Sequence, residues 1–510
     1  MKLFSRLLAG LLAAATLGVF ASCGANKSVE STTAKATDSA VETTVKSNSA
    51  AATTTVKATA KQAQSVTNMK GYATIGELIS RTKNKKGNAS DSFVKSLKGY
   101  KLNVMQAWEP AKSGKIYDSN KYCMNEVEKQ YGVKINVGGF FLQYNEQLTA
   151  KLTSRSAEAQ IYMVQNFNYA SYFKNGYLCD LSMAMSKAGV DFKDPWYNQD
   201  SKNFLNVNYK QYGWVAYGAE YTFPYGILYN KNLIKKAKLT DIEDLVKNGK
   251  WTWANLEKYA KKLNTANIVG FGVTDTSLML ASMSATKGGT LVNVKKGKSP
   301  TSNIDAQVNK DCLSQLVKWC KNGGICNTFS KQDWTYPKAQ FSAGKVAMLY
   351  CSHDAIKNTI TNKSFKDSIG FVPFPTQTAT KKYTNICIPQ FIWFIPSQHK
   401  SEAAKALFVN NELMRQQYRF SQRNFEINWK SYFDDKDTID MECNMMYSRG
   451  MFHNVYDWRS VCETGKTQTI SIINLAISSG GVQNAIDTYK TALDKSYKSV
   501  WNGFRITGNL

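Results

Sequence analysis

The sequence is short of the residues on which metal and acid–base chemistry most often depends. Its 510 residues include three histidines, His353, His399 and His453, which stand far apart in the chain. No His-Glu-x-x-His pattern and no cysteine–histidine spacing typical of zinc occurs, so we expect neither a metal nor a cofactor. Gly465-Lys466-Thr467 ends like a phosphate-binding loop, but Ser460 stands where the first glycine is required.

Acidic residues are also scarce. The chain has 38 Asp and Glu against 65 Lys and Arg, a formal net charge of +27. A glycosidase holds two carboxylates across a cleft, and no spacing among acids such as Glu109, Asp275 and Asp354 selects a pair, so we expect no enzyme. The basic–aromatic motifs of nucleic-acid recognition are missing, so we expect no nucleic-acid partner. A cationic surface facing an anionic envelope and an acidic ligand both remain open.

The N-terminus has the pattern of a lipoprotein signal. Residues 1–22 combine Lys2 and Arg6 with an apolar run that is too short to span a membrane, and Cys23 follows two small residues. We predict lipidation of Cys23; an ordinary cleaved signal is the alternative. Residues 23–70 lack aromatic residues, Leu and Ile, so we predict a disordered tether. No later stretch reads as a membrane span.

Nine further cysteines follow Cys23, so at least one has no partner within the chain. No Cys-x-x-Cys motif occurs. Cys312 and Cys320 lie about 12 Å apart on a predicted helix and cannot bridge each other, whereas Cys320 and Cys326 can. The default interpretation is buried, reduced cysteines.

The pattern of apolar residues predicts alternating strands and helices. We expect strands at 102–108, 133–137 and 161–164, separated by helices at 121–131 and 144–155, with a loop at 165–169. This alternation favours a mainly parallel α/β sheet. Further along, 226–229 reads as a strand that stops at Asn230, Asn232 as the cap of a short helix, and Thr252 as the cap of a helix that reaches Leu263.

Four motifs in this order carry a resemblance to a known family. Along the chain they are the Gly-x-Leu-x-Asp-Leu turn at 176–181, Tyr229-Asn230-Lys231-Asn232-Leu233, Trp251-Thr252-Trp253, and Phe-x-x-Gly-Lys-x-Ala-Met at 341–348. Together they resemble bacterial extracellular solute-binding proteins of the maltose-binding type, the capture subunits of sugar ABC importers. The resemblance extends over roughly 102–501, and residues 415–448 carry no family motif and are a candidate insertion.

The resemblance implies a periplasmic-binding-protein-like α/β fold, with two α/β lobes joined by a multi-strand hinge and a ligand cleft between them. We expect the first lobe at 71–219 with part of 390–445, and the second at 220–388 with 446–510. Ligand sites in open α/β sheets lie beyond the carboxyl ends of strands. The candidate ligand-binding residues at such places are Trp108, Glu109, Gln165, Asn166, Asn168, Tyr169, Tyr221, Tyr225, Asp275, Ser352, His353, Asp354, Trp393 and Trp458.

These side chains suit a polyhydroxyl ligand, because aromatic faces stack on sugar C–H surfaces while amides and carboxylates bond hydroxyls. Structural roles compete with this interpretation: the tryptophans also suit core packing, and Asp275 suits a helix cap. Tyr225 is the anchor of the set, and its burial within one lobe would remove that anchor.

The resemblance therefore implies a substrate-binding lipoprotein of an ABC importer, a monomer held by its lipid at the extracellular face of the cytoplasmic membrane. The expected solute is an oligosaccharide, and the expected partners are the membrane subunits of a permease. Two alternatives stay open: a secreted glycan-active enzyme, and a surface lipoprotein that tethers glycans without transport.

Overall fold

The computed structural model describes residues 89–508, except 111, 113–114, 140–143, 217–221, 322, 329–334, 354, 361–364, 390, 431–432, 434 and 463–466. The chain divides into two units, 1–66 and 67–510, and every described residue belongs to the second. The predicted signal, the lipidation site Cys23 and the tether lie outside the described residues.

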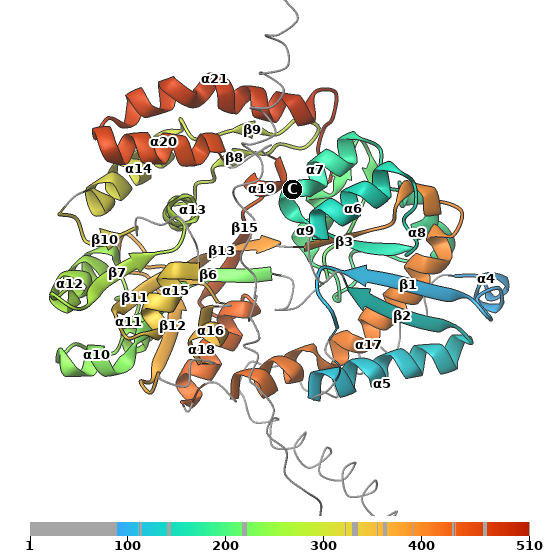
Figure 1. Cartoon of the computed structure of the whole chain (residues 1–510), viewed down its shortest axis with the longest axis horizontal. Helices are drawn as coiled ribbons and strands as arrows, with labels where there is room; N and C mark the ends of the chain where they lie inside the picture. The colour runs from blue at the N-terminus through green and yellow to red at the C-terminus, as the bar shows by residue number, and fades with distance from the viewer. Residues whose placement is uncertain are drawn as a thin grey trace, which may run out of the picture. The chain divides into compact units, whose positions relative to one another are not determined.

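The first of two sheets has four strands in the order β14-β3-β1-β2, and Figure 1 shows β1, β2 and β3 in it. Its strands are β1 (Lys101–Gln106), β2 (Lys134–Gly139), β3 (Ile161–Gln165) and β14 (Phe391–Phe394). β1 is parallel to β2 and β3, whereas β14 runs antiparallel to β3. Helices α5 (Lys115–Tyr131) and α6 (Tyr144–Thr153) connect the parallel strands, which confirms the predicted alternation.

A seven-stranded sheet forms the second system, in the order β10-β7-β11-β6-β13-β15, with β12 also paired to β6. The strands are β6 (Thr222–Asn230), β7 (Val269–Val273), β10 (Cys326–Asn327), β11 (Val346–Ser352), β12 (Ile369–Pro373), β13 (Tyr383–Pro389) and β15 (Phe452–Tyr456). Every side chain of β11 and β12 is buried, as expected of strands with both faces covered.

The remaining helices and short strands complete the two systems. The helices are α4 (Asp91–Lys95), α7 (Asn166–Lys174), α8 (Ser182–Ala188), α9 (Gln199–Phe204), α10 (Lys231–Lys236), α11 (Ile242–Lys247), α12 (Trp253–Leu263), α13 (Thr276–Thr286), α14 (Gln307–Cys320), α15 (Thr335–Ser342), α16 (Ala355–Ile360), η1 (Ser397–His399), α17 (Ala403–Lys430), α18 (Lys436–Met446), α19 (Arg459–Cys462), α20 (Thr467–Ser479) and α21 (Val482–Trp501). Two short hairpins are formed by β4 (Asn206–Val207) with β5 (Lys210–Gln211), and by β8 (Val292–Asn293) with β9 (Thr301–Ser302).

The chain passes between the two sheets at three places. It enters β6 after residue 216, it returns through residue 390 from β13 to β14, and it leaves again between α17 and α18. α17 packs on α5 and α8 beside the first sheet, whereas α18 packs on β12 and β15 of the second (Figure 1). Residues 415–448, to which no motif was assigned, therefore contain the end of α17 and all of α18.

The strand-to-helix turn after β6 corrects one prediction. The cap of α10 is Asn230, whose Oδ1 accepts the backbone N–H of Leu233 at 3.0 Å. Asn232 lies within the helix and donates its side-chain amide to Asp367 at 2.8 Å. Both asparagines fit the capping preference, but the strand pairing with β12 extends to Asn230 and fixes where the helix begins. Thr252 caps α12 as predicted.

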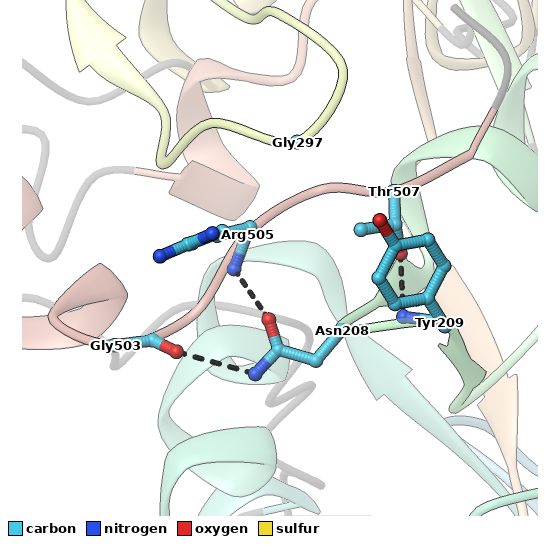
Figure 2. A pocket seen from close by; sticks show the side chains of 6 residues that line it. All are labelled: Asn208, Tyr209, Gly297, Gly503, Arg505 and Thr507. Atoms are coloured by element: carbon cyan, nitrogen blue, oxygen red, sulfur yellow. Dashed lines mark hydrogen bonds between the residues drawn. The ribbon is translucent and has the colours of Figure 1, made fainter.

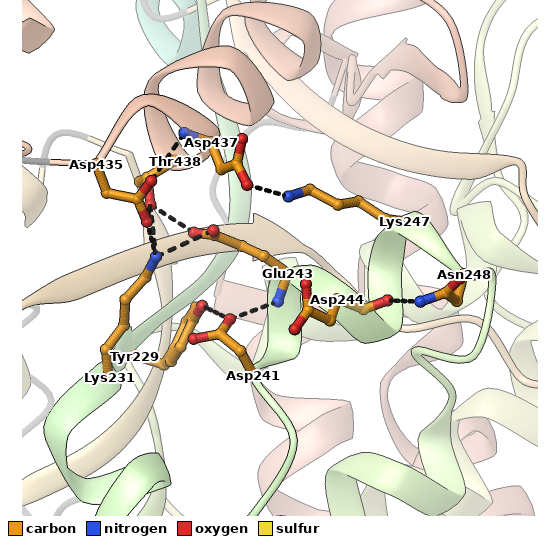
Figure 3. A network of polar contacts seen from close by, with 10 residues as sticks. All are labelled: Tyr229, Lys231, Asp241, Glu243, Asp244, Lys247, Asn248, Asp435, Asp437 and Thr438. Atoms are coloured by element: carbon orange, nitrogen blue, oxygen red, sulfur yellow. Dashed lines mark hydrogen bonds and ion pairs between the residues drawn. The ribbon is translucent and has the colours of Figure 1, made fainter.

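A buried polar network fastens α18 to the segment after β6 (Figure 3). Lys231 Nζ donates to Glu243 at 3.0 Å, to Asp435 at 2.6 Å and to Thr438 at 2.7 Å. Burial raises the pKa of Glu243, and the charge of Lys231 lowers it again in part. Glu442, also on α18, stands outside this network: it is fully buried, and its carboxyl oxygens have no hydrogen-bond partner among the described residues.

No disulfide joins the nine described cysteines, and seven of them are buried, in line with the default interpretation. Cys320 and Cys326 are the exceptions in burial, and the Sγ of Cys320 lies 2.7 Å from the Sγ of Cys326. Cys320 and Cys326, the pair that the sequence spacing allowed to bond, therefore lie next to each other as two thiols without a disulfide between them. Within the described part of the chain, no helix has both the length and the apolar character needed to cross a membrane.

Candidate ligand-binding site

The carboxyl edge of the first sheet presents an open aromatic side chain. Trp108 follows β1, is 40% exposed, and meets the ring of Phe391 edge-on with the ring centroids 5.0 Å apart. Phe391 lies opposite Gln165, the last residue of β3, in the strand register. A Cβ on Gly139 would lie 2.0 Å from the backbone oxygen of Trp108, so glycine at that position lets the Trp108 backbone approach β2.

Polar side chains surround this aromatic pair. Glu109 is exposed beside Trp108. Gln165 is half-buried, and its Oε1 accepts the side-chain amide of Asn145 at 2.6 Å. The structure thus brings three predicted residues, Trp108, Glu109 and Gln165, to one edge. Phe391 was missed by the sequence interpretation, because only its antiparallel pairing with β3 places it there.

The predicted loop at 165–169 is the start of helix α7, which begins at Asn166 directly after the strand. The asparagines favour turns, but here they open a helix. Asn168 is half-buried, while Asn166 and Tyr169 are buried. Burial raises the pKa of Tyr169 well above its usual value, and its hydroxyl has no hydrogen-bond partner among the described residues.

At the edge of the second sheet the predicted residues are buried. Tyr225 lies opposite Ser352 in the pairing of β6 with β11 and is 8% exposed, with its ring centroid 5.7 Å from that of Tyr350. Ser352 and His353 are buried as well, and the His353 N–H donates to the backbone oxygen of Pro224. Tyr225 therefore does not serve as an open anchor of the site in this structure. Tyr221 and Asp354 lie outside the described residues.

Asp275 caps the start of helix α13, which was the alternative to a role in ligand binding. Its Oδ1 accepts the N–H of Ser277 at 2.8 Å and of Leu278 at 3.1 Å, and the hydroxyl of Ser277 at 2.6 Å. These bonds satisfy two of the free N–H groups at the start of α13.

Trp393 and Trp458 are both packed. Trp393 is buried in β14 and exchanges backbone hydrogen bonds with Trp214. Trp458 is buried and stacks on Phe204, with the ring centroids 4.0 Å apart. The competing interpretation of these tryptophans as packing residues fits their surroundings.

Beside Trp458 stands a charged pair that the sequence interpretation missed. Arg459 is 2% exposed, its Nη2 lies 3.4 Å from Asp457, and its Nη1 donates to the backbone oxygen of Ser277 at 3.3 Å. Burial raises the pKa of Tyr350 well above its usual value, and nearby Asp275 and Asp457 raise it further. Buried charges at strand ends mark candidate sites, but neither residue stands in a sequence motif. Among the described residues no group of His, Cys, Asp or Glu is arranged to hold a metal ion.

Two sheets of mixed parallel and antiparallel strands, linked by three crossings and with aromatic and polar side chains at the strand ends, define a protein of the periplasmic-binding type. Solved structures of this fold match most of the chain. An ABC substrate-binding protein from Listeria monocytogenes in complex with cycloalternan is 17% identical, with a TM-score of 0.54, covering 78% of this chain and 98% of that one. A cyclo/maltodextrin-binding protein complexed with maltotetraose is 16% identical, with a TM-score of 0.55, covering 79% and 98%.

A third structure of the same fold has a different kind of ligand: UgpB from Mycobacterium tuberculosis, in complex with glycerophosphocholine. It is 13% identical, with a TM-score of 0.55, covering 78% of this chain and 98% of that one. No curated protein sequence gives a significant match. The sequence pattern of the bacterial extracellular solute-binding protein family matches residues 119–410, more than half of the chain. The protein belongs to this family, which confirms the resemblance and the predicted fold class.

Proposed function

We propose that the protein is the substrate-binding subunit of an ABC importer and that its solute is an oligosaccharide. The observation that carries the choice of solute is the exposed Trp108 beside Gln165 and Glu109 at the edge of the first sheet. An indole face stacks on the C–H surface of a sugar, and the amide and carboxylate bond its hydroxyls. Solved relatives described with cycloalternan and maltotetraose support the same class of ligand.

Binding works by closure of two lobes over the solute. The first lobe comprises 71–219 with part of 390–445, and the second comprises 220–388 with 446–510. The three passages of the chain between the sheets act as the hinge, since a few residues at element ends absorb the rotation. A solute that contacts both lobes shifts the population to the closed form, which the permease recognises. No bond in the solute is made or broken, so the protein is not an enzyme.

The first lobe supplies the exposed part of the site, and the second lobe completes it. Trp108, Glu109 and Gln165 make the first contacts. The second lobe adds residues from its strand ends, including those whose side chains are now buried. The full set of proposed ligand-binding residues is Trp108, Glu109, Gln165, Asn166, Asn168, Tyr169, Tyr221, Tyr225, Asp275, Ser352, His353, Asp354, Trp393 and Trp458.

The site is held at the cell surface by the N-terminus. Cys23 carries the lipid and becomes the first residue once residues 1–22 are removed. Residues 24–70 link this lipidated cysteine to the folded part. A coil of that length spans roughly 35–40 Å, so a monomer anchored at the extracellular face of the cytoplasmic membrane reaches both its solute and its permease.

Calorimetry and thermal shift with linear and cyclic glucose oligosaccharides test the proposal on the purified full chain. We expect a dissociation constant between nanomolar and micromolar, a raised melting temperature, and unchanged sugar recovered afterwards by chromatography. Release of shorter sugars would show an enzyme instead. Absence of binding by every sugar, including those released from bacterial envelopes, would overturn the choice of oligosaccharide.

A further inference from the structure

A hollow lies where the β4–β5 hairpin meets the C-terminal tail (Figure 2). It has a volume of about 290 Å³. Three segments border it: the hairpin tip, the tail 503–507 and the loop that carries Gly297. Its lining residues are Asn208, Tyr209, Gly297, Gly503, Arg505 and Thr507.

Hydrogen bonds join the hairpin, which belongs to the first proposed lobe, to the tail, which belongs to the second, and they shape the hollow in this structure. Asn208 accepts the N–H of Arg505 at 2.9 Å through Oδ1 and donates to the oxygen of Gly503 at 3.2 Å through Nδ2. The N–H of Tyr209 donates to the hydroxyl of Thr507 at 2.6 Å. On the far side of the tail, the N–H of Gly297 donates to the oxygen of Ile506 at 2.7 Å. A site built in advance loses little conformational freedom on binding.

At the hairpin tip, Tyr209 adopts a backbone conformation that tyrosine rarely adopts. Asn208 and Tyr209 have φ of 49° and 65°, the left-handed pair of a two-residue hairpin turn. Such turns favour Asn followed by Gly, because a Cβ is strained there. Tyr209 is nevertheless 80% exposed, so burial of its ring does not offset the strain. The backbone of Tyr209 bonds Thr507, but its exposed ring does not pack in the fold, and a strained residue with a free aromatic face points to a role in binding.

The charge around the hollow is positive. Arg505 is exposed, none of the six lining residues is acidic, and the bordering loop adds exposed Lys295 and Lys298. A tyrosine ring stacks on a sugar, and a guanidinium pairs with a carboxylate or phosphate group. We propose that this hollow binds a saccharide unit that carries a carboxylate or phosphate group.

This second site does not rest on the proposed transport function, because it shares no residue with the edge that carries Trp108. The composition allowed two interpretations of the positive net charge, a cationic surface and an acidic ligand. This site favours the second for the part of the charge that lies around the hollow. The two sites are separable by mutation, since each has an exposed aromatic residue of its own.

The test is calorimetry on the full chain with trigalacturonic acid and glucose 6-phosphate, and with maltotriose as the neutral comparison. We expect at least one anionic sugar to bind with a dissociation constant of about 10 µM to 1 mM. Binding should weaken several-fold when the salt concentration rises from about 50 to about 300 mM, because exposed charges are screened. The stronger of the two anionic probes shows whether carboxylate or phosphate is preferred.

Tyr209→Gly is the decisive variant, because glycine relieves the strained turn and the protein stays folded. We expect it, and separately Arg505→Gln, to weaken anionic binding at least tenfold. Arg155→Gly is the matched control: Arg155 is also exposed with a φ of 55°, so this change relieves strain and removes a cation elsewhere. Trp108→Ala should leave anionic binding unchanged. The proposal is overturned if neither anionic probe binds, if Tyr209→Gly binds normally, or if maltotriose binds at the hollow equally well.

Discussion

The carboxyl edges of the two sheets differ in how they use the side chains placed there. At the first sheet, Trp108 is 40% exposed and Glu109 is open to solvent. At the second sheet, Tyr225 and His353 are buried, and Asp275 is bonded to the start of its helix. The position of a residue after a strand therefore identifies the edge on which it lies, while neighbouring segments decide whether a ligand can reach it.

The covering of the second edge has a physical cause. β11 ends against β6, so Ser352 and Tyr225 shield each other, and the segment after β15 brings Asp457 and Arg459 against the start of α13. β1 instead ends next to Gly139, which offers no side chain to cover Trp108. The first edge is thus prepared for contact with a ligand, and the second is held together by internal bonds.

Among the variants that test this difference between the two edges, Arg459→Met should change the stability of the protein most. It removes the cation that faces Asp457 and leaves the carboxylate with the backbone N–H of residue 459 as its remaining partner, so the free energy of unfolding should fall by about 3 kcal/mol. Urea unfolding followed by tryptophan fluorescence measures this. The double variant Arg459→Met, Asp457→Asn should recover a large part of the loss. A stable single variant that no longer binds sugar would instead make Arg459 a ligand contact, and the two edges would then be alike.

A pH dependence should show that the second sheet and its helices hold a buried carboxyl group in its protonated form. Burial, reinforced by the nearby Glu243, raises the pKa of Glu442 well above 4.5. Below the unfolded pKa both states hold the proton and nothing is lost. As the pH rises the unfolded state releases it first, so stability falls until the raised folded pKa is passed. Each unit of raised pKa corresponds to about 1.4 kcal/mol.

Glu442→Gln should therefore unfold at higher urea than the natural protein at pH 8 and equally at pH 4, and its stability should depend less on pH. Glu126→Gln, a change of an exposed carboxylate on α5, serves as the control for a general loss of negative charge. Equal pH profiles for the natural protein and Glu442→Gln would contradict a protonated Glu442.

Trp108→Ala should affect ligand binding far more than stability. Because the side chain is 40% exposed, we expect the free energy of unfolding to fall by less than about 1 kcal/mol. Loss of the stacking surface should weaken sugar binding at least tenfold, about 1.4 kcal/mol. Tyr122→Ala is the matched control, since Tyr122 is 50% exposed on α5. If both variants bind sugar normally, the first edge is not the site of capture.

Local rules predicted much of this fold. The strand–helix alternation and the cap at Thr252 both follow from short sequence patterns. The start of α10 did not, because Asn230 and Asn232 are both good caps and only pairing with a distant strand decides between them. The turn at Asn208 and Tyr209 was missed since tyrosine is a poor signal for it.

The candidate site was less predictable than the fold, because exposure depends on contacts between distant segments. Tyr225 is covered by Ser352 and Tyr350, which stand more than a hundred residues later in the chain. Phe391 reaches Trp108 only because β14 returns from the second sheet to the first. No sequence window contains either pair.

The smallest effect should come from Asp275, and it separates capping from ligand binding. Asp275→Ala removes the acceptor of two helix N–H groups and should cost about 1 kcal/mol of stability. Asp275→Ser keeps an acceptor for the cap but removes the charge, so its stability should stay within about 0.5 kcal/mol of the natural protein. If Asp275 only caps α13, both variants bind sugar as the natural protein does in calorimetry. Loss of binding in the stable Asp275→Ser variant would show that the carboxylate reaches the solute, and that the second edge opens to contribute to the site.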